Sequence, residues 1–294
     1  MIFWENVING LSLGSVYAII ALGYSMVYGI SKMLNFAHGD VIMVGAYVSF
    51  SGLAYLQLPP LLTVLLAMGF CSLLGILIEG LAYRPLRGAG SLAVLITAIG
   101  VSYFLQNVAL LIFGSAPKSY RSILAGVDGL QLMGGQLLIT SEALATLALC
   151  FLVMLAMVVF TEKTKAGKAM RAVAEDNKAA KLMGINVNTT IALTFALGSG
   201  LAALAGILLC SSYPALLPTT GAMPGIKAFT AAVFGGIGSL PGAMLGGLVL
   251  GLIEILGRAY VSSELSDALV FGVLILVLLI KPTGLLGKPM REKV

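Results

Sequence analysis

The residues that could carry chemistry in this 294-residue chain are few and scattered. His38 is the only histidine, and no cysteine or second histidine lies near it, so it cannot build a zinc site of the usual kind. A catalytic histidine would need a nucleophile and an orienting acid, and although Asp40 lies close by, no serine elbow is evident. We therefore expect no catalytic residue and no metal site. We expect His38 and Asn35 to hydrogen-bond a polar backbone turn instead.

Two carboxylates, Glu79 and Glu254, fall inside long apolar stretches. Carboxylates at membrane depth can mark ion or proton pathways. Glu79, however, precedes Arg84 by five residues, and Glu254 precedes Arg258 by four, which is the favourable helical order for an ion pair. Local pairing near the membrane interface is therefore favoured over a proton relay.

The chain contains no nucleotide-binding loop. Such a loop needs G-x-x-x-x-G-K-[ST], because its backbone N–H groups cradle phosphates and its hydroxyl binds Mg²⁺. The nearest fragments, AGKAM at Gly167 and LLGKPM at Gly287, lack both the earlier glycine and the hydroxyl residue after lysine. No HExxH, GxSxG or paired-aspartate signature supports an enzyme either. We expect no cofactor in this chain, so any ATP hydrolysis would occur on another chain.

The composition indicates which elements must position these residues. The apolar fraction is 59%, the charged fraction is 10% and the mean hydropathy is +1.05, whereas an average soluble domain is about 25% charged. A chain so poor in charge must turn much of its surface to lipid. The net charge of +5 comes from lysines and arginines gathered in a few loops, which is typical of a topology signal rather than of nucleic-acid binding.

The hydropathy pattern predicts an all-α, polytopic transmembrane bundle of about eight spans, arranged as one domain over residues 1–294. The segment 114–140 is too long for a tight turn, and we expect a short strand pair or an interfacial piece there. The break GGIGSLPG divides a long apolar run at residues 239–241. The expected spans are 7–30, 41–56, 61–83, 92–113, 142–160, 191–211, a short piece at 226–238, a longer one ending at 260, and 268–280.

Basic residues predict the orientation of these spans. They cluster in three regions: the loop 161–190, Arg84 and Arg87 after the third span, and the C-terminal tail with Lys281, Lys288, Arg291 and Lys293. All three can lie in the cytoplasm if 226–238 crosses the membrane, and the N-terminus then lies outside. If 226–238 is only re-entrant, the N-terminus moves inside.

The most polar stretch, at 161–190, has the pattern of two short helices. Residues 168–173 can form an amphipathic turn, and Asp176 or Asn177 can then cap a second helix, because a short side-chain oxygen accepts the unpaired N–H groups of the first turn. Gly184 fits the left-handed position that ends a helix, and Asn188 or Thr189 can cap the next span. The apolar residues of this second helix (Ala180, Leu182 and Met183) have no core in their own loop. The stretch is either an ordinary basic loop or a helix that docks on a cytoplasmic partner.

The segment EDNKAAKLMGIN in this loop resembles the coupling loop of permease subunits of bacterial ABC importers, and it is most similar to the branched-chain amino acid permeases of the LivH type. Three other segments also resemble that family. They are LNFAHGDVIMVGAY at 34–47, FGGIGSLPGAMLGG at 234–247 and KPTGLLGK at 281–288. The resemblance covers essentially the whole chain in the order of the family.

The resemblance implies a single permease domain over 1–294 in a bacterial inner membrane, with a cytoplasmic C-terminus. It implies three kinds of partner besides the bilayer: a second related permease, two cytoplasmic ATPases that bind ATP and Mg²⁺, and a periplasmic binding protein that delivers leucine, isoleucine or valine. The residues implied to contact the ATPase are Glu175, Asp176, Asn177, Lys178, Ala179, Ala180, Lys181, Leu182, Met183 and Gly184.

The translocation path is less defined by the sequence. We expect it among polar span residues and the glycine-rich break, which is either a plain turn or part of the path. The candidates are Ser12, Ser15, Tyr17, Asn35, His38, Thr97, Gln106, Gly235, Gly236 and Gly238. Two other functions remain open: a permease for urea or short amides, which resembles this type, and a stand-alone secondary transporter, which would need a driving-ion site.

Overall fold

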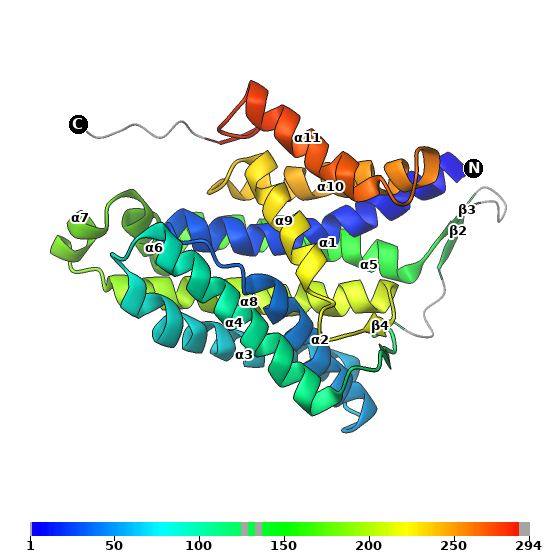
Figure 1. Ribbon diagram of the computed structural model, residues 1–294, viewed down its shortest axis with the longest axis horizontal. Coiled ribbons are helices and arrows are strands. Elements are labelled where there is room, and N and C mark those ends of the chain that lie inside the picture. Colours follow the sequence, from blue (N-terminus) through cyan, green and yellow to red (C-terminus); the bar gives the residue numbers. More distant parts are fainter. Residues whose placement is uncertain (1, 125–128, 133–136, 288–294) are drawn as a thin grey trace.

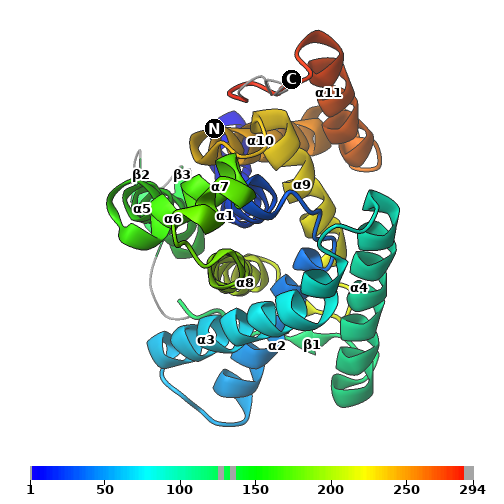
Figure 2. The same ribbon diagram turned by 90° about the vertical axis from the view of Figure 1, so that its left-hand side faces the viewer.

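Helix α1 (Ile2–Ser31) forms the centre of a helical bundle in the computed structural model, which describes residues 2–124, 129–132 and 137–287. Figure 2 shows α1 enclosed by α5, α8, α9 and α10. Its residues from Ser12 to Val27 are all buried. Small residues allow this close packing: a Cβ on Gly14 would lie only 2.8 Å from the Leu248 backbone of α10 (Leu240–Tyr260). Such contacts replace the hydrophobic driving force that helices lack inside lipid.

The outer helices are apolar on most sides. They are α3 (Pro60–Ile78), α4 (Ser91–Phe113) and α5 (Ser141–Lys163). Many of their leucine, isoleucine and phenylalanine side chains are exposed, including Leu111 and Phe104 on α4. Helices apolar around their whole circumference are typical of membrane spans. The expected all-α polytopic bundle is confirmed.

Every expected span corresponds to a helix, and these helices differ in whether they are long and apolar enough to cross a membrane. In the described part of the chain, six helices are long and apolar enough to cross: Ile2–Ser31, Pro60–Leu86, Ser91–Phe113, Ser141–Lys163, Val187–Ser212 (α8) and Leu240–Tyr260. The other three are α2 (His38–Ala54), α9 (Ala222–Gly235) and α11 (Ser266–Ile280), with 17, 14 and 15 residues. A full crossing takes about 20 residues. The expected break also holds, because Ser239 caps α10 at Leu240.

Helices α2 and α9 are short because both begin inside the bundle. The chain turns back after α1, so that the side chain of His38, the first residue of α2, faces Gly23 and Tyr24 of α1. Gly23 lies eight residues before the end of α1, or about 12 Å along the helix axis. Helix α9 begins beside the same place, because Gly39 contacts Gly221 and Gly225. Irregular backbone at this depth is tolerated where protein buries it.

The two ends of the bundle differ. Four short strands lie at the end that also holds the N-terminal part of α1 (Figure 1). Strand β1 (Lys118–Ser119) pairs antiparallel with β4 (Ala215–Leu216), and β2 (Leu130–Leu132) pairs antiparallel with β3 (Leu137–Ile139). The strand pair expected within 114–140 is therefore confirmed. Next to β1, the buried Tyr120 hydroxyl lies 2.7 Å from the Ser49 hydroxyl, and burial raises the pKa of Tyr120 to about 12.

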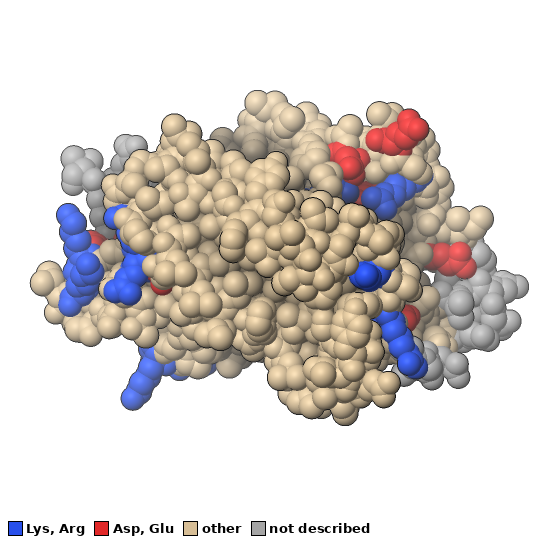
Figure 3. All heavy atoms as spheres, turned by 60° about the horizontal axis from the view of Figure 1, so that its bottom comes forward, with Lys and Arg blue, Asp and Glu red and all other residues tan. Residues whose placement is uncertain are grey.

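The opposite end holds α6 (Lys165–Glu175) and α7 (Asn177–Leu182), and lysine and arginine side chains gather on this end in Figure 3. The turn of α3 into the π-helix η1 (Glu79–Tyr83) and the 3₁₀ helix η2 (Arg84–Leu86) adds further basic residues. Of the basic tail residues, Lys288, Arg291 and Lys293 lie outside the described residues. The N-terminal end of α1 and helix α7 lie at opposite ends of the bundle (Figure 1), and the side of the membrane on which each end lies stays a prediction.

Candidate functional site

Helices α6 and α7 are held in shape by local caps. Thr164 caps α6, accepting a hydrogen bond of 3.0 Å from the Gly167 backbone N–H. Asp176 caps α7, accepting bonds of 2.8 and 3.1 Å from the N–H groups of Lys178 and Ala179. Gly184 ends the turn with φ of +81°, a conformation that costs glycine little. The cap at Asp176 and the glycine stop are as expected.

The apolar residues of α7 divide into two groups. Ala180 is only 3% exposed and belongs to the main hydrophobic core, whereas Leu182 and Met183 are 89% and 82% exposed. Lys178 and Lys181 are exposed beside them. A bulky residue at Ala180 would therefore disturb the loop itself, while Leu182 and Met183 form the apolar surface available to a partner.

Replacing Asp176 with alanine is expected to loosen α7 without unfolding the bundle. The first turn would lose its acceptor for two N–H groups, and the loss of an N-cap costs about 1 kcal/mol. Hydrogen exchange at the Lys178 and Ala179 amides should become about fivefold faster, because about 1 kcal/mol corresponds to that factor. Asp176→Asn keeps an acceptor oxygen and is the matched control. Equal exchange in the alanine and asparagine variants would contradict the capping role.

Polar contacts connect this loop to the interior of the bundle. Arg87 forms an ion pair with buried Glu79 and donates a hydrogen bond of 2.6 Å to Asn188, near the start of α8. From the same π-helix, the Tyr83 hydroxyl donates to Asn35 at 2.9 Å. π-Helical turns occur frequently at functional sites. These contacts link the start of α8, which follows α7, to the buried segment that precedes α2.

Three sequence expectations about this region are wrong in detail. Glu79 pairs with Arg87 rather than with Arg84, because the π-helix and the 3₁₀ turn replace regular helical spacing there. Asn186, not Asn188 or Thr189, caps α8. The Asn35 side chain contacts Tyr83 instead of a backbone turn, since the segment before α2 lies against η1.

The interior start of α2 carries the polar residues of the first family-like segment. His38 is 1% exposed, its ring lies 4.5 Å from that of Tyr24, and its Nε2 atom has no hydrogen-bond partner among the described residues. Asp40, also buried, accepts a hydrogen bond of 2.8 Å from Gln106 of α4. The His38 side chain does hydrogen-bond the backbone, as expected, but its partner is Ile20 in the middle of α1 rather than a turn.

The glycine-rich break is a turn joining α9 and α10. Gly236 and Gly238 have φ of +104° and +91°, and the Gly238 N–H donates to the Ser25 hydroxyl at 2.8 Å. The carbonyls of Phe234 and Gly235 accept bonds of 2.9 Å from Leu285 and Leu286. The C-terminal family-like segment therefore packs on this turn.

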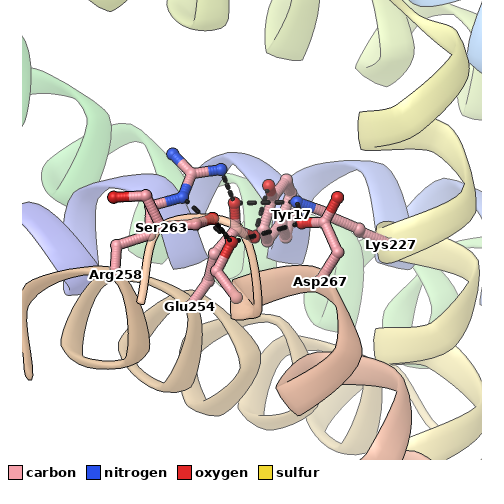
Figure 4. Close-up of polar contacts among 7 residues, drawn as sticks. Tyr17, Lys227, Glu254, Arg258, Ser263 and Asp267 are labelled. Carbon is pink, nitrogen blue, oxygen red and sulfur yellow. Dashed lines mark hydrogen bonds and ion pairs between the residues drawn. The ribbon is translucent and has the colours of Figure 1, made fainter. Parts of the chain in front are cut away.

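A buried network of charged side chains joins α1, α9, α10 and α11 (Figure 4). Oε1 of Glu254 accepts from Lys227 at 2.8 Å and from Arg258, and Oε2 accepts from the Tyr17 hydroxyl at 2.9 Å. Lys227 also forms an ion pair of 2.7 Å with Asp267. We call Tyr17, Lys227, Glu254, Arg258 and Asp267 the charge cluster. The pairing of Glu254 with Arg258 is confirmed, but it is one contact of several.

A cavity of about 660 Å³ lies next to the charge cluster. Its lining is half polar, and it includes Asn9, Ser12, Leu13, Val16, Ile255 and Arg258. Exposed Trp4 and Tyr260, both in ring contact with Phe3, lie at the ends of α1 and α10 nearest this cavity. Such aromatic residues are typical of a membrane–water interface. Glu254 lies six residues before Tyr260, or about 9 Å deeper along the helix.

The structure does not gather the candidate path residues at one place. Ser12 lines the cavity and Tyr17 belongs to the charge cluster, while Ser15 bonds the Leu11 carbonyl of its own helix. Asn35, His38 and Gln106 lie around the start of α2, Thr97 is half-buried on α4, and Gly235, Gly236 and Gly238 form the turn at the end of α9.

The sequence reasoning missed Lys227. It is 4% exposed and holds two carboxylates. The sequence does indicate its importance, because Lys227 and Glu254 are the only charged residues in the apolar run 212–257. An ionisable residue within a span is a functional candidate by default.

The described residues contain no group of three or more His, Cys, Asp or Glu side chains that could hold a metal ion. A bundle of lipid-facing helices with a capped, exposed helix at its basic end is the architecture of a membrane permease subunit. The comparisons with known proteins agree. Residues 6–278 match the family described as "Branched-chain amino acid transport system / permease component". The chain belongs to this family.

Individual relatives show how similar the chain is to characterised members. The high-affinity branched-chain amino acid transport system permease protein LivH of Escherichia coli K12 is 48% identical over 302 residues, covering 99% of this chain and 98% of that protein. The corresponding protein BraD of Pseudomonas aeruginosa is 47% identical with the same coverage. Among solved structures, PsaBC from Streptococcus pneumoniae in complex with Fab aligns with a TM-score of 0.48 and 17% identity, over 94% of this chain and 91% of that chain.

Proposed function

We propose that this chain is the permease subunit of an ATP-driven ABC importer that moves branched-chain amino acids across a bacterial inner membrane. The observation that carries the proposal is the exposed apolar pair Leu182 and Met183 on a capped helix at the basic end of the bundle. Two large apolar side chains in water are unfavourable unless a partner covers them. Membership of the permease family supports a cytoplasmic ATPase as this partner.

The arrangement of the chain supports one assignment of roles to this permease and its partner proteins. The whole of 1–294 acts as one permease domain, and the end with α6 and α7 faces the cytoplasm because its basic residues favour that side. The C-terminus lies on the same side and the N-terminus on the other. The chain works with a second permease and two ATPases, which bind ATP and Mg²⁺, and it receives substrate from a periplasmic binding protein. It catalyses no reaction itself.

Reconstitution tests this function. The permease pair with its ATPases should be placed in proteoliposomes with the loaded binding protein, and uptake of radiolabelled leucine, isoleucine, valine and urea should be measured with and without ATP. We expect ATP-dependent uptake of the three amino acids and none of urea. Uptake of urea alone would identify an amide permease. Uptake by this chain alone under an ion gradient would identify a secondary transporter.

A further inference from the structure

Charged side chains buried among membrane helices, like those of the charge cluster, are rare in membrane proteins. Four charged side chains are contributed by α9, α10 and α11, and the central two, Lys227 and Glu254, are 5% and 1% exposed. Removing such charges from water costs several kcal/mol each, and a buried ion pair seldom stabilises a protein more than apolar residues of the same volume would. Helix packing alone therefore does not account for the cluster, and charges of this kind are functional candidates.

The cluster is a linear series of alternating charges. Its order is Arg258, Glu254, Lys227 and Asp267, so each charge has an opposite neighbour and the sum is zero. The two ends, Arg258 and Asp267, have side chains 40% and 43% exposed, while the middle is buried. A ligand can therefore enter the series at an end more easily than in its middle.

The cavity meets the series at the Arg258 end. Arg258 lines the cavity, and so does Ile255, the neighbour of Glu254. From α1, Val16 lines the cavity beside Tyr17, whose hydroxyl holds Glu254. Only the Arg258 guanidinium, also 3.4 Å from the Ser266 hydroxyl, is recorded as both a cavity wall and a partner of Glu254. Movement of this one half-exposed side chain would open Glu254 to the cavity.

We propose that the cavity and the Arg258–Glu254 pair form a binding site for the zwitterionic head of an aliphatic α-amino acid. The ligand carboxylate replaces Glu254 on Arg258, and the ligand ammonium group replaces Arg258 on Glu254. Lys227 and the Tyr17 hydroxyl hold Glu254 in position during the exchange. The apolar lining, including Leu13, Val16 and Ile255, accommodates the aliphatic side chain. This inference rests on the proposed function and names the groups that recognise its substrate.

Charge balance gives this site its selectivity. A zwitterion inserted between Arg258 and Glu254 leaves every charge of the series paired, so no unpaired charge is buried. A neutral amide or urea would separate the pair without replacing either charge. A carboxylic acid without an ammonium group would leave its anion facing Glu254, and an amino acid amide would leave Arg258 unpaired. Unpaired charges in such a site are strongly disfavoured.

Ligand-dependent stability of the unmutated complex provides the first test. The purified permease–ATPase complex, without binding protein, is heated with millimolar L-leucine, 4-methylpentanoate, leucinamide or urea, because a ligand that binds only the folded state raises Tm. We expect L-leucine alone to raise Tm. An equal rise with 4-methylpentanoate would overturn the proposal, as would the absence of any rise with L-leucine.

Substitutions provide the second test. Glu254→Gln and Arg258→Gln should abolish the leucine-dependent rise in Tm, and the amount of leucine taken up per ATP hydrolysed should fall about tenfold. The matched control is Glu264→Gln, which removes an exposed carboxylate between α10 and α11, outside both the cavity and the charge cluster. It should behave as the unmutated chain. A leucine-dependent rise in Tm that persists in Glu254→Gln, or that is lost equally in Glu264→Gln, would overturn the proposal.

A purely structural role gives a different pattern. The double variant Glu254→Met/Lys227→Met removes the central pair and keeps the net charge of the cluster at zero. The remaining Arg258 and Asp267 side chains are 40% and 43% exposed and can be hydrated. A structural role therefore predicts normal uptake, whereas the proposed site predicts none. Normal uptake in this variant would overturn the inference while ATP-dependent leucine uptake by the unmutated complex still supported the proposed function. Absence of leucine uptake by the unmutated complex would overturn the proposed function itself.

Discussion

Replacing Leu182 with aspartate is expected to weaken binding of the cytoplasmic ATPase by about 10- to 100-fold. The side chain is 89% exposed in the permease alone, so the free chain should fold normally. Burying one leucine side chain in an interface contributes about 1.5–3 kcal/mol, and a charge in its place would also have to lose its water. The affinity of the purified permease for the ATPase, measured as binding of the ATPase to immobilised permease, tests the expected loss.

Leu182→Met is the matched control, because it keeps an apolar side chain of similar volume. It should bind the ATPase within about threefold of the original, since volume-conserving apolar changes cost less than about 1.5 kcal/mol. Met183→Asp should resemble Leu182→Asp, as Met183 is 82% exposed on the same loop. Unchanged ATPase affinity in both aspartate variants would show that α7 is an ordinary basic loop.

Replacing Gly39 with valine is expected to destabilise the protein by about 2–4 kcal/mol and to abolish uptake. A Cβ on Gly39 would lie 2.8 Å from the Gly221 carbonyl oxygen, and Gly225 lies on the same side at 3.4 Å. The neighbours are backbone atoms, which cannot move aside as a side chain can. Overpacking a filled site costs about 1–3 kcal/mol, and here the starts of α2 and α9 would also separate. Thermal unfolding in detergent measures the loss of stability.

Gly100→Val is the control for this substitution. Gly100 lies on α4, and a Cβ there would meet nothing within 4 Å. The variant should unfold at the same temperature as the unmutated chain and retain uptake. Equal stability of the Gly39 and Gly100 variants would mean that the two helix starts are not held by this contact.

Helix α7 and the contact between Gly39 and Gly221 lie at different depths of the bundle. Helix α7 is exposed at the basic end, and the helix starts at Gly39 and Gly221 lie inside the bundle. Two hydrogen bonds lie between these two depths. One joins Arg87 to Asn188, and the other joins Tyr83 to Asn35. The two contacts are joined through the backbone of η1, whose first residue, Glu79, pairs with Arg87 and whose last residue, Tyr83, bonds Asn35. The sequence lacks a nucleotide-binding loop, and α7 is the helix that we propose as the docking site for a separate ATPase.

Several features of this protein follow from its sequence by itself. The helices, the break before Leu240, the cap at Asp176 and the stop at Gly184 depend on the composition and on neighbours within a few residues. The pairing of Glu254 with Arg258 likewise spans a single helical turn. Local sequence determines such features because the interacting groups are fixed relative to one another by one helix.

Only the tertiary structure decided how the functional side chains meet. Tyr17 and Glu254 are 237 positions apart in the chain, and Lys227 reaches Glu254 from a different helix. The burial of Ala180 and the placement of His38 against Gly23 likewise depend on contacts between elements. Hydropathy could not reveal them, because a membrane span looks equally apolar whether it faces lipid or another helix. The absence of an ATP-binding loop was certain from the sequence, but the place where the bundle could recognise a zwitterion depended on which helices pack together.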